Sequence, residues 1–256
     1  HTIGRRQRQM CIRDRSYSNE DIIADYKHYA GENAEELTAD QIFQQCGVRT
    51  RYSAPLNDTA KDIGNKAAQK LFEEWSIDRS EIDYIMFISD ALDYKGPTTA
   101  CVMQRDLDLP ESIGAIDILH GCTGWVYGMS LAKALIMSGQ AKSVLVVTAD
   151  TPTKVVHPED IELRAIFSDA AAATLVQSEP NEALGIALED FIFGTDGKGE
   201  ENLYTSRSAT RDPATIDWLK KHEHIPGGLT RGRLVMNSSK IFLFAFRKVP
   251  LLVREV

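Results

Sequence analysis

The sequence predicts an α/β fold in which helices cover both faces of a parallel sheet. Two observations lead to this prediction. Three apolar runs have the length of buried strands, at residues 84–88, 116–119 and 144–147, and only the second contains a charged residue, Asp117. Each run follows a segment with helical periodicity, and strands that alternate with helices are typical of parallel sheets. We therefore expect a buried sheet as the centre of the structure.

Length and composition place the chain among globular proteins. Its 256 residues, of which 43% are hydrophobic, suffice for one large domain or two modest ones. The formal net charge of −8 argues against nucleic acid as a partner. No apolar run approaches the roughly 18 to 20 residues of a membrane span, so we expect no membrane partner either. The cysteines are irregularly spaced and form no CxxC pair, which indicates reduced thiols and a cytoplasmic protein.

The first fifteen residues differ from everything after them. They hold five arginines and one aspartate, without the amphipathic apolar face of a transit peptide. The stretch RRQRQMCIRDR also resembles a translated adapter sequence. We interpret residues 1–15 as a non-native tail outside the fold, and we assign no role to Cys11.

A helix is predicted first, from residue 60 to about residue 75. Asn57, Asp58 and Thr59 supply N-cap side chains immediately before it. Apolar residues then recur at helical spacing and form one stripe. These residues are Ala60, Ile63, Ala67, Ala68, Leu71, Phe72 and Trp75.

The remaining elements follow in order. After the strand at 84–88, an apolar helix at 98–107 suits either a subunit interface or the interior. The strand at 116–119 runs through an elbow into a long apolar helix that ends near residue 137. The strand at 144–147 comes next, and the alanine run at 171–176 predicts a strand pressed closely against a helix. Residues 179–235 have the composition of connecting loops, and residues 240–256 read as a helix.

Cys122 lies at the apex of the elbow, between Gly121 and Gly124. The start of a helix lowers a thiol's pKa and can hold an oxyanion, which favours a nucleophile. The glycines would permit a tight bend and close approach of a substrate. Most free cysteines are small buried core residues, so the spacing leaves both interpretations open. His120, at the end of the strand, suggests packing more than catalysis.

A series of motifs occurs in order between residues 16 and 256. They are SNEDI at 18–22, GVRTR at 47–51, the elbow from Asp117 to Trp125, VLVVTAD at 144–150, FSDAAAATLV at 167–176, GTDGKGEENL at 194–203 and MNSSKIFLFA at 236–245. This series resembles the β-ketoacyl-acyl carrier protein synthase III family of the thiolase superfamily. The elbow is similar to the family's D-x-x-x-x-C-[ST]-G-[FW], which identifies Cys122 with its nucleophile.

The resemblance implies a thiolase-like fold of layered α/β/α architecture with a mixed sheet. Members of the family consist of two similar halves. Residues 16–178 would form the N-terminal half with the nucleophile, residues 179–235 a connecting segment, and residues 236–256 the start of the second half. We therefore expect this chain to be truncated, with most of the C-terminal half missing.

The resemblance also implies an acyltransferase of fatty acid biosynthesis, or of related lipid metabolism. Cys122 would accept an acyl group from a thioester, and condensation with a malonyl thioester would follow. Acyl carrier protein is the expected partner, no cofactor or metal is expected, and the full-length protein would be a homodimer. The family's histidine and asparagine, which belong to the second half, are absent, and no histidine lies in a pattern like H-Q-A-N.

Two other functions therefore remain open. The acyl group on Cys122 could pass to an alcohol or an amine. Alternatively, the chain could be an inactive fragment or partner subunit that lacks the catalytic histidine and asparagine. Transfer of an acyl group to Cys122 separates an active chain from an inactive one.

Departures from the family's pattern bear on the substrate. Gly96 replaces a residue that in some members is bulky and limits acyl length, which implies a longer acyl chain or else a turn with Pro97. Trp125 replaces a phenylalanine beside the nucleophile and would either reshape the substrate pocket or fill core. Gln41 and Gln45 stand where many members sandwich the adenine of CoA, which favours a carrier-protein-bound starter.

Overall fold

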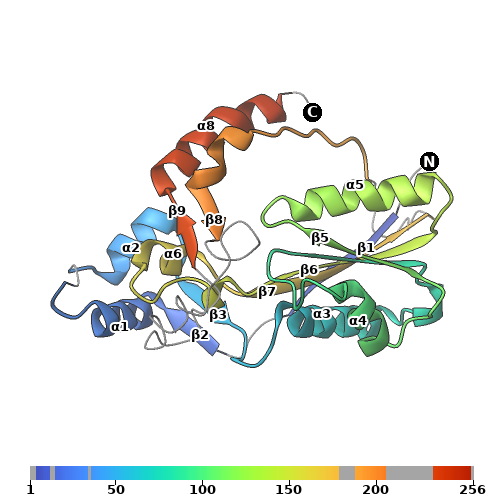
Figure 1. Ribbon diagram of the computed structural model, residues 1–256, viewed down its shortest axis with the longest axis horizontal. Coiled ribbons are helices and arrows are strands. Elements are labelled where there is room, and N and C mark those ends of the chain that lie inside the picture. Colours follow the sequence, from blue (N-terminus) through green and yellow to red (C-terminus); the bar gives the residue numbers. More distant parts are fainter. Residues whose placement is uncertain (1–3, 12–14, 34–35, 179–187, 206–232, 255–256) are drawn as a thin grey trace. The chain divides into compact units, whose positions relative to one another are not determined.

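The computed structural model describes residues 4–11, 15–33, 36–178, 188–205 and 233–254 (Figure 1). The chain forms two compact units, each made of separate segments. The first unit contains residues up to 15, residues 52–151 and residues 169–191. The second contains residues 16–51, 152–168 and 192–256. The boundaries that we predict at residues 178 and 235 follow the family's halves and stay predictions.

The first unit is built on a five-stranded sheet in the order β1-β7-β6-β4-β5. The strands are β1 (Gly4–Cys11), β4 (Tyr84–Ser89), β5 (Gly114–Leu119), β6 (Ser143–Asp150) and β7 (Ala170–Gln177). Strand β4 pairs in parallel with β5 and with β6, which confirms the three predicted parallel strands.

Strand β7 corrects the expectation of a purely parallel sheet. It runs antiparallel to β6, with Ala170 opposite Asp150. The chain re-enters the sheet at the end where β6 left it, so the next strand must run in the opposite direction. The sheet is thus mixed, as the family resemblance implies.

The structure also differs from our expectation that residues 1–15 take no part in the fold. Residues 4–11 form β1, which pairs antiparallel with β7 at the edge of the sheet. A backbone ladder needs only N–H and C=O groups, and β7 would otherwise be an open edge. The non-native origin of these residues stays a prediction.

Helices cover both faces of this sheet (Figure 1). On one face lie α3 (Ala60–Trp75) and α4 (Thr99–Asp106). Helix α3 begins with a capping box, because Thr59 and Asp62 each accept a hydrogen bond from the other's backbone N–H. The predicted helix from 60 to about 75 is therefore confirmed.

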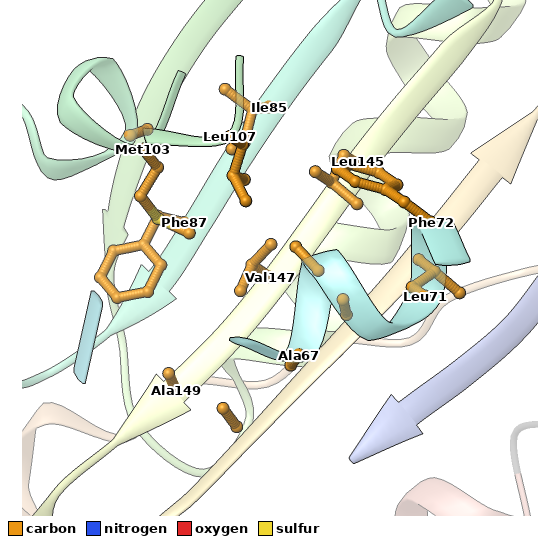
Figure 2. Close-up of a cluster of buried hydrophobic side chains, with 14 of the residues drawn as sticks. Ala67, Leu71, Phe72, Ile85, Phe87, Met103, Leu107, Leu145, Val147 and Ala149 are labelled. Carbon is orange, nitrogen blue, oxygen red and sulfur yellow. The ribbon is translucent and has the colours of Figure 1, made fainter. Parts of the chain in front are cut away.

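The larger hydrophobic core lies between α3, α4 and the sheet (Figure 2). The predicted stripe of α3 supplies Ala67, Leu71 and Phe72, all buried. Ala171 and Ala173 of β7 belong to the same cluster, which confirms a strand pressed against a helix. The other labelled side chains come from β4, β6, α4 and the residue that follows α4. They are Ile85, Phe87, Met103, Leu107, Leu145, Val147 and Ala149 (Figure 2).

Helix α5 (Gly124–Met137) covers the other face. Its buried residues are Gly124, Gly128, Met129, Ala132 and Ile136, and they pack over β4 and β6. A Cβ on Gly128 would lie 2.2 Å from Ile88 Cδ1, and one on Gly124 would lie 2.5 Å from Ile88 Cγ2. The two glycines thus let α5 approach β4 more closely than any larger residue would allow.

The second unit is organised around short helices and small two-stranded sheets. Its sheets pair β2 with β3 and β8 with β9. The elements are β2 (Arg15–Ser18), α1 (Asn19–Ala30), α2 (Ala39–Cys46), β3 (Thr50–Ser53), α6 (Ile161–Ile166), β8 (Leu203–Thr205), β9 (Leu234–Met236) and α8 (Ser238–Val253). Short 3-10 helices lie at Gly31–Asn33, Pro152–Lys154 and Gly197–Asn202 in this unit and at Arg79–Glu81 in the first.

Arg51 ties three helices of this unit together. Its side chain is 1% exposed, and its Nε donates to the carbonyl oxygen of Ala165 at 2.8 Å. The guanidinium also donates to Asn19 Oδ1 and contacts Cys46 Sγ at 3.3 Å. Because burial outweighs these contacts, the pKa of Arg51 lies below its ordinary value.

Helix α8 confirms the helix that we predict at residues 240–256 as far as Val253. Asn237 caps it by accepting a hydrogen bond from the N–H of Lys240 at 3.1 Å. Much of its apolar surface is exposed, including Phe242, Phe244, Phe246 and Val253. Residues 179–187 and 206–232 of the predicted connecting segment lie outside the described residues. Over the described ranges, no helix combines the length and the hydropathy required to cross a bilayer.

Candidate functional site

The elbow around Cys122 joins β5 to α5. Strand β5 ends at Leu119, and the Gly124 N–H bonds to the carbonyl oxygen of Gly121 at 2.9 Å to close the turn. Cys122 is a free thiol and is exposed. The alternative that Cys122 is a small buried core residue is therefore wrong.

The order of the strands gives this elbow a particular place in the sheet. Strand β4 leads into α4 on one face, whereas its neighbour β5 leads into α5 on the other (Figure 1). Ligands of open α/β sheets bind outside the carboxyl ends of strands at such a switch point. Cys122 follows β5 directly, so it lies where this architecture places reactive groups.

The start of α5 favours a negative charge. The N-cap residue Thr123 makes no side-chain cap hydrogen bond, and the first turn contains no acidic residue. The positive end of the helix dipole, with no acidic side chain opposing it in the first turn, therefore favours an anion at this end. An oxyanion that forms beside Cys122 would be stabilised here.

His120 packs against α5. Its ring stacks on Tyr127, with centroids 4.8 Å apart and planes inclined by 29°. Its Nδ1 lies 3.5 Å from Thr123 Oγ1. The packing role predicted for His120 is confirmed by this stacking.

Asp117 belongs to the elbow motif but acts at a distance from Cys122. Its two carboxylate oxygens accept hydrogen bonds from the N–H groups of Thr99 and Ala100, at 2.6 and 2.7 Å. Thr98, the N-cap residue of α4, makes no side-chain cap hydrogen bond. Asp117 therefore caps α4 from the neighbouring strand, a role that the sequence pattern did not reveal.

A pair of carboxyl groups that sequence reasoning missed lies at the same end of the sheet. Asp150 ends β6, and its Oδ1 accepts hydrogen bonds from Ser89 Oγ at 2.8 Å and from the Asp90 N–H at 2.9 Å. Burial, followed by the hydrogen bond and charge of Asp90, raises the pKa of Asp150 to about 8. The signal in the sequence was an aspartate at the end of each of two apolar strands.

The two predicted substrate residues, Gly96 and Trp125, lie in different surroundings. Gly96 lies in the loop after β4, and a Cβ added to it would meet open space. Its peptide bond to Pro97 is cis. Trp125, on the first turn of α5, packs against the core of that face, as the core-filling interpretation predicts. Neither placement tests a substrate contact.

The apolar side of α4 faces inward, since Ala100 and Met103 are fully buried, while Cys101 is exposed.

Gln41, which stands where many family members sandwich the adenine of CoA, closes the capping box of α2. Its Oε1 accepts a hydrogen bond from the Thr38 N–H at 2.8 Å. Within the described residues, no group of three histidine, cysteine or acidic side chains is arranged to hold a metal ion.

Comparison with known proteins indicates the same family as the sequence motifs. Residues 116–197 match the family described as 3-oxoacyl-[acyl-carrier-protein (ACP)] synthase III. A β-ketoacyl-[acyl-carrier-protein] synthase III of Chlamydia trachomatis is 32% identical over 214 residues, which are 84% of this chain and 62% of that relative. A second such relative, from Staphylococcus epidermidis, is 32% identical over 221 residues, 86% of this chain and 63% of its own length. This chain therefore spans less than two thirds of these curated relatives.

Solved structures of similar fold indicate the same family. A crystal structure of a 3-oxoacyl-(acyl-carrier-protein) synthase III matches 100% of this chain and 73% of its own, with a TM-score of 0.86 and 33% identity. A 3-oxoacyl-(acyl-carrier protein) synthase from Burkholderia xenovorans matches 100% of this chain and 68% of its own, with a TM-score of 0.79 and 27% identity. The fold is thus the α/β fold of the thiolase superfamily that the motifs imply. With its motifs, sheet and relatives in agreement, the chain belongs to the 3-oxoacyl-[acyl-carrier-protein] synthase III family.

Proposed function

We propose that this chain is the nucleophile-bearing part of a β-ketoacyl-acyl carrier protein synthase III-like condensing enzyme, with Cys122 as its nucleophile. The observation that carries the proposal is an exposed thiol at the start of α5, at the switch point of the sheet. Family membership supports the same reaction. The reaction needs no cofactor, because both steps are acyl chemistry.

The first step transfers an acyl group to Cys122. The thiolate attacks the carbonyl carbon of an acyl thioester, and the positive end of the α5 dipole stabilises the oxyanion. The carbon–sulfur bond of the donor then breaks, and the donor leaves as a thiol once it has taken up a proton. Cys122 retains the acyl group as a new thioester.

The second step forms a carbon–carbon bond. A malonyl thioester loses carbon dioxide, and the electron pair of the broken bond forms an enolate. The enolate attacks the acyl carbonyl on Cys122, and a β-ketoacyl thioester leaves while the thiolate is restored. In the family, a histidine and an asparagine of the second half assist this step.

Partners and location follow from the same proposal. We propose an acyl carrier protein as donor, because Gln41 is engaged in the cap of α2 where many members of the family hold adenine. We propose a cytoplasmic homodimer for the full-length protein. Strand β5 supports a dimer, since it lies at the edge of the sheet and exposes Ile116 and Leu119.

Intact mass spectrometry tests the acyl-transfer step. After mixing with acyl-carrier-protein thioesters, we expect the mass of the chain to rise by one acyl group, and we expect Cys122→Ala to abolish the rise. Cys101→Ala is the matched control, because Cys101 is also free and exposed. A chain that remains unmodified, or a rise that persists in Cys122→Ala, would overturn the proposal and favour an inactive fragment.

The same assay tests the predicted substrate residues. If Gly96 leaves room for a long acyl chain, Gly96→Phe should reduce transfer of long acyl groups and spare acetyl transfer. We expect Trp125→Phe to shift the preferred acyl length if Trp125 contacts the substrate. Transfer of acetyl groups only by the unaltered chain would contradict the proposal for Gly96.

A further inference from the structure

The loop at residues 90–98, between β4 and α4, lies against the elbow that carries the proposed nucleophile. Just before the loop, the carbonyl oxygen of Ser89 accepts a hydrogen bond from the His120 N–H at 3.4 Å. Asp90 Oδ2 lies 3.5 Å from the position that a Cβ on Gly121 would occupy. Both elbow residues come directly before the nucleophile in the sequence, so the loop forms one side of the thiol's surroundings.

Asp150, at the end of β6, holds the start of this loop. Its Oδ1 accepts hydrogen bonds from Ser89 Oγ at 2.8 Å and from the Asp90 N–H at 2.9 Å. Ser89 Oγ in turn accepts a hydrogen bond from the Ala91 N–H at 2.9 Å. One carboxyl oxygen thus fixes three successive residues at the point where the chain leaves β4.

Asp117, on β5, holds the other end of the loop through the N–H groups of Thr99 and Ala100. Strand β4 lies between β5 and β6, so the loop is anchored from both neighbouring strands. Residues 94–97 between the anchors are exposed. Because exposed side chains add little packing, the two anchors determine where the loop lies.

We propose that Asp150 is a positioning residue, which holds residues 90–98 as a wall beside Cys122 and so limits the size of the groups that reach the thiol. Without this anchor, two hydrogen bonds are lost and the start of the loop leaves the elbow more often. Bulky groups then reach Cys122 more readily. Selection among acyl groups rests on the proposed function, whereas access of other reagents to the thiol does not.

The test compares Asp150→Ala, which removes the anchor, with Asp150→Asn, which keeps it. The asparagine oxygen can accept both hydrogen bonds, because Oδ1 of Asp150 accepts both of them. Asp83→Ala is the matched control. Oδ2 of Asp83 accepts two backbone N–H groups, those of Lys142 and Ser143 at 2.6 and 3.0 Å, at the end of β4 opposite to the elbow.

Two maleimides that differ only in bulk measure access to Cys122. N-methylmaleimide and N-cyclohexylmaleimide share one reactive ring, so the ratio of their labelling rates does not depend on the ionisation of the thiol. Mass spectrometry of the labelled peptide quantifies each rate. We expect Asp150→Ala to raise the rate of the bulky reagent relative to the small one about threefold. Asp150→Asn and Asp83→Ala should keep the ratio of the unaltered chain.

Amide hydrogen exchange gives a second readout of the wall. Exchange at residues 90–98 should become about five- to tenfold faster in Asp150→Ala and stay unchanged in Asp150→Asn and Asp83→Ala. Ser89→Ala removes the hydroxyl between Asp150 and the Ala91 N–H, and it should change both readouts in the same direction even if Asp150→Ala does not fold. A labelling ratio that loss of the anchor leaves unchanged, or that Asp83→Ala changes equally, would overturn the inference.

Because maleimides need no acyl donor, the outcome is separate from the proposed acyl transfer. A chain that accepts no acyl group, but whose labelling ratio rises in Asp150→Ala, would refute the proposed function and retain the wall. A chain that accepts acyl groups while Asp150→Ala leaves the ratio unchanged would do the reverse. Where both hold, Asp150→Ala should also raise octanoyl transfer relative to acetyl transfer about threefold.

Discussion

Asp117 on β5 accepts a hydrogen bond from the backbone N–H of Thr99 at 2.6 Å and caps α4 from the neighbouring strand. The second carboxylate oxygen binds the next N–H, that of Ala100. One side chain thus satisfies two N–H groups that the N-cap residue of α4 leaves without a side-chain partner.

We expect Asp117→Ala to lower the free energy of unfolding by about 1 to 3 kcal/mol, because two partly buried N–H groups lose a charged acceptor. Urea unfolding followed by circular dichroism measures this. Glu74→Ala is the control, since Glu74 is an exposed carboxylate within α3, and it should change stability by less than about 0.5 kcal/mol. Equal effects of the two substitutions would contradict the capping role.

The close approach of α5 to β4 gives a prediction with an internal control. Gly128→Ala should destabilise the fold by about 1 to 3 kcal/mol, because its Cβ would lie 2.2 Å from Ile88 Cδ1. Ile88→Val removes that atom and should partly rescue Gly128→Ala. It should not rescue Gly124→Ala, whose Cβ would meet Cγ2 of Ile88 at 2.5 Å, since valine retains that methyl group.

Thermal melts of the single and double variants measure these effects. Rescue of both glycine variants, or of neither, would show that contact with Ile88 does not limit the approach of the helix.

Arg51 should be intolerant even of lysine. Its guanidinium bonds to Ala165 and Asn19 from a buried position, and a lysine ammonium cannot reproduce that planar set of donors. We expect Arg51→Lys to lower the free energy of unfolding by about 2 to 4 kcal/mol. Arg247→Lys, at an exposed position of α8, should be nearly neutral in the same urea titration. A neutral Arg51→Lys would mean that the three helices do not depend on these bonds.

The raised pKa of Asp150 makes stability depend on pH. The ordinary value is 3.8 and the folded value about 8, so between them the folded chain binds a proton that the unfolded chain has released. The contribution of Asp150 to stability is therefore complete below pH 4 and is lost as the pH rises to 8. The slope reaches about 1.4 kcal/mol per pH unit.

Asp150→Asn has no such proton to lose. Relative to the unaltered chain, its free energy of unfolding should increase as the pH rises from 5 to 8. Urea titrations at pH 5, 6.5 and 8 measure this change. A difference between the two chains that stays constant with pH would show that Asp150 ionises normally.

Much of the fold was accessible from the sequence because the relevant signals are local. The apolar runs of β4, β5 and β6 have strand length, and α3 is marked by its cap and its stripe. The elbow is equally local, because a cysteine between glycines joins a strand to a helix within a few residues. The ordered motifs then sufficed to identify the family.

Pairing between distant segments was decided only by the tertiary structure. The antiparallel course of β7, and the pairing of β1 with it, depend on backbone ladders that carry no periodic signature. The meeting of Asp90 with Asp150, sixty residues apart, depends on β4 and β6 being neighbours in the sheet. By itself the sequence determined strands β4 to β7, helices α3 and α5, and the elbow that carries Cys122. The strand order decided that Ser89, Asp90 and Asp150 meet, because groups at strand ends come together only once the sheet is assembled.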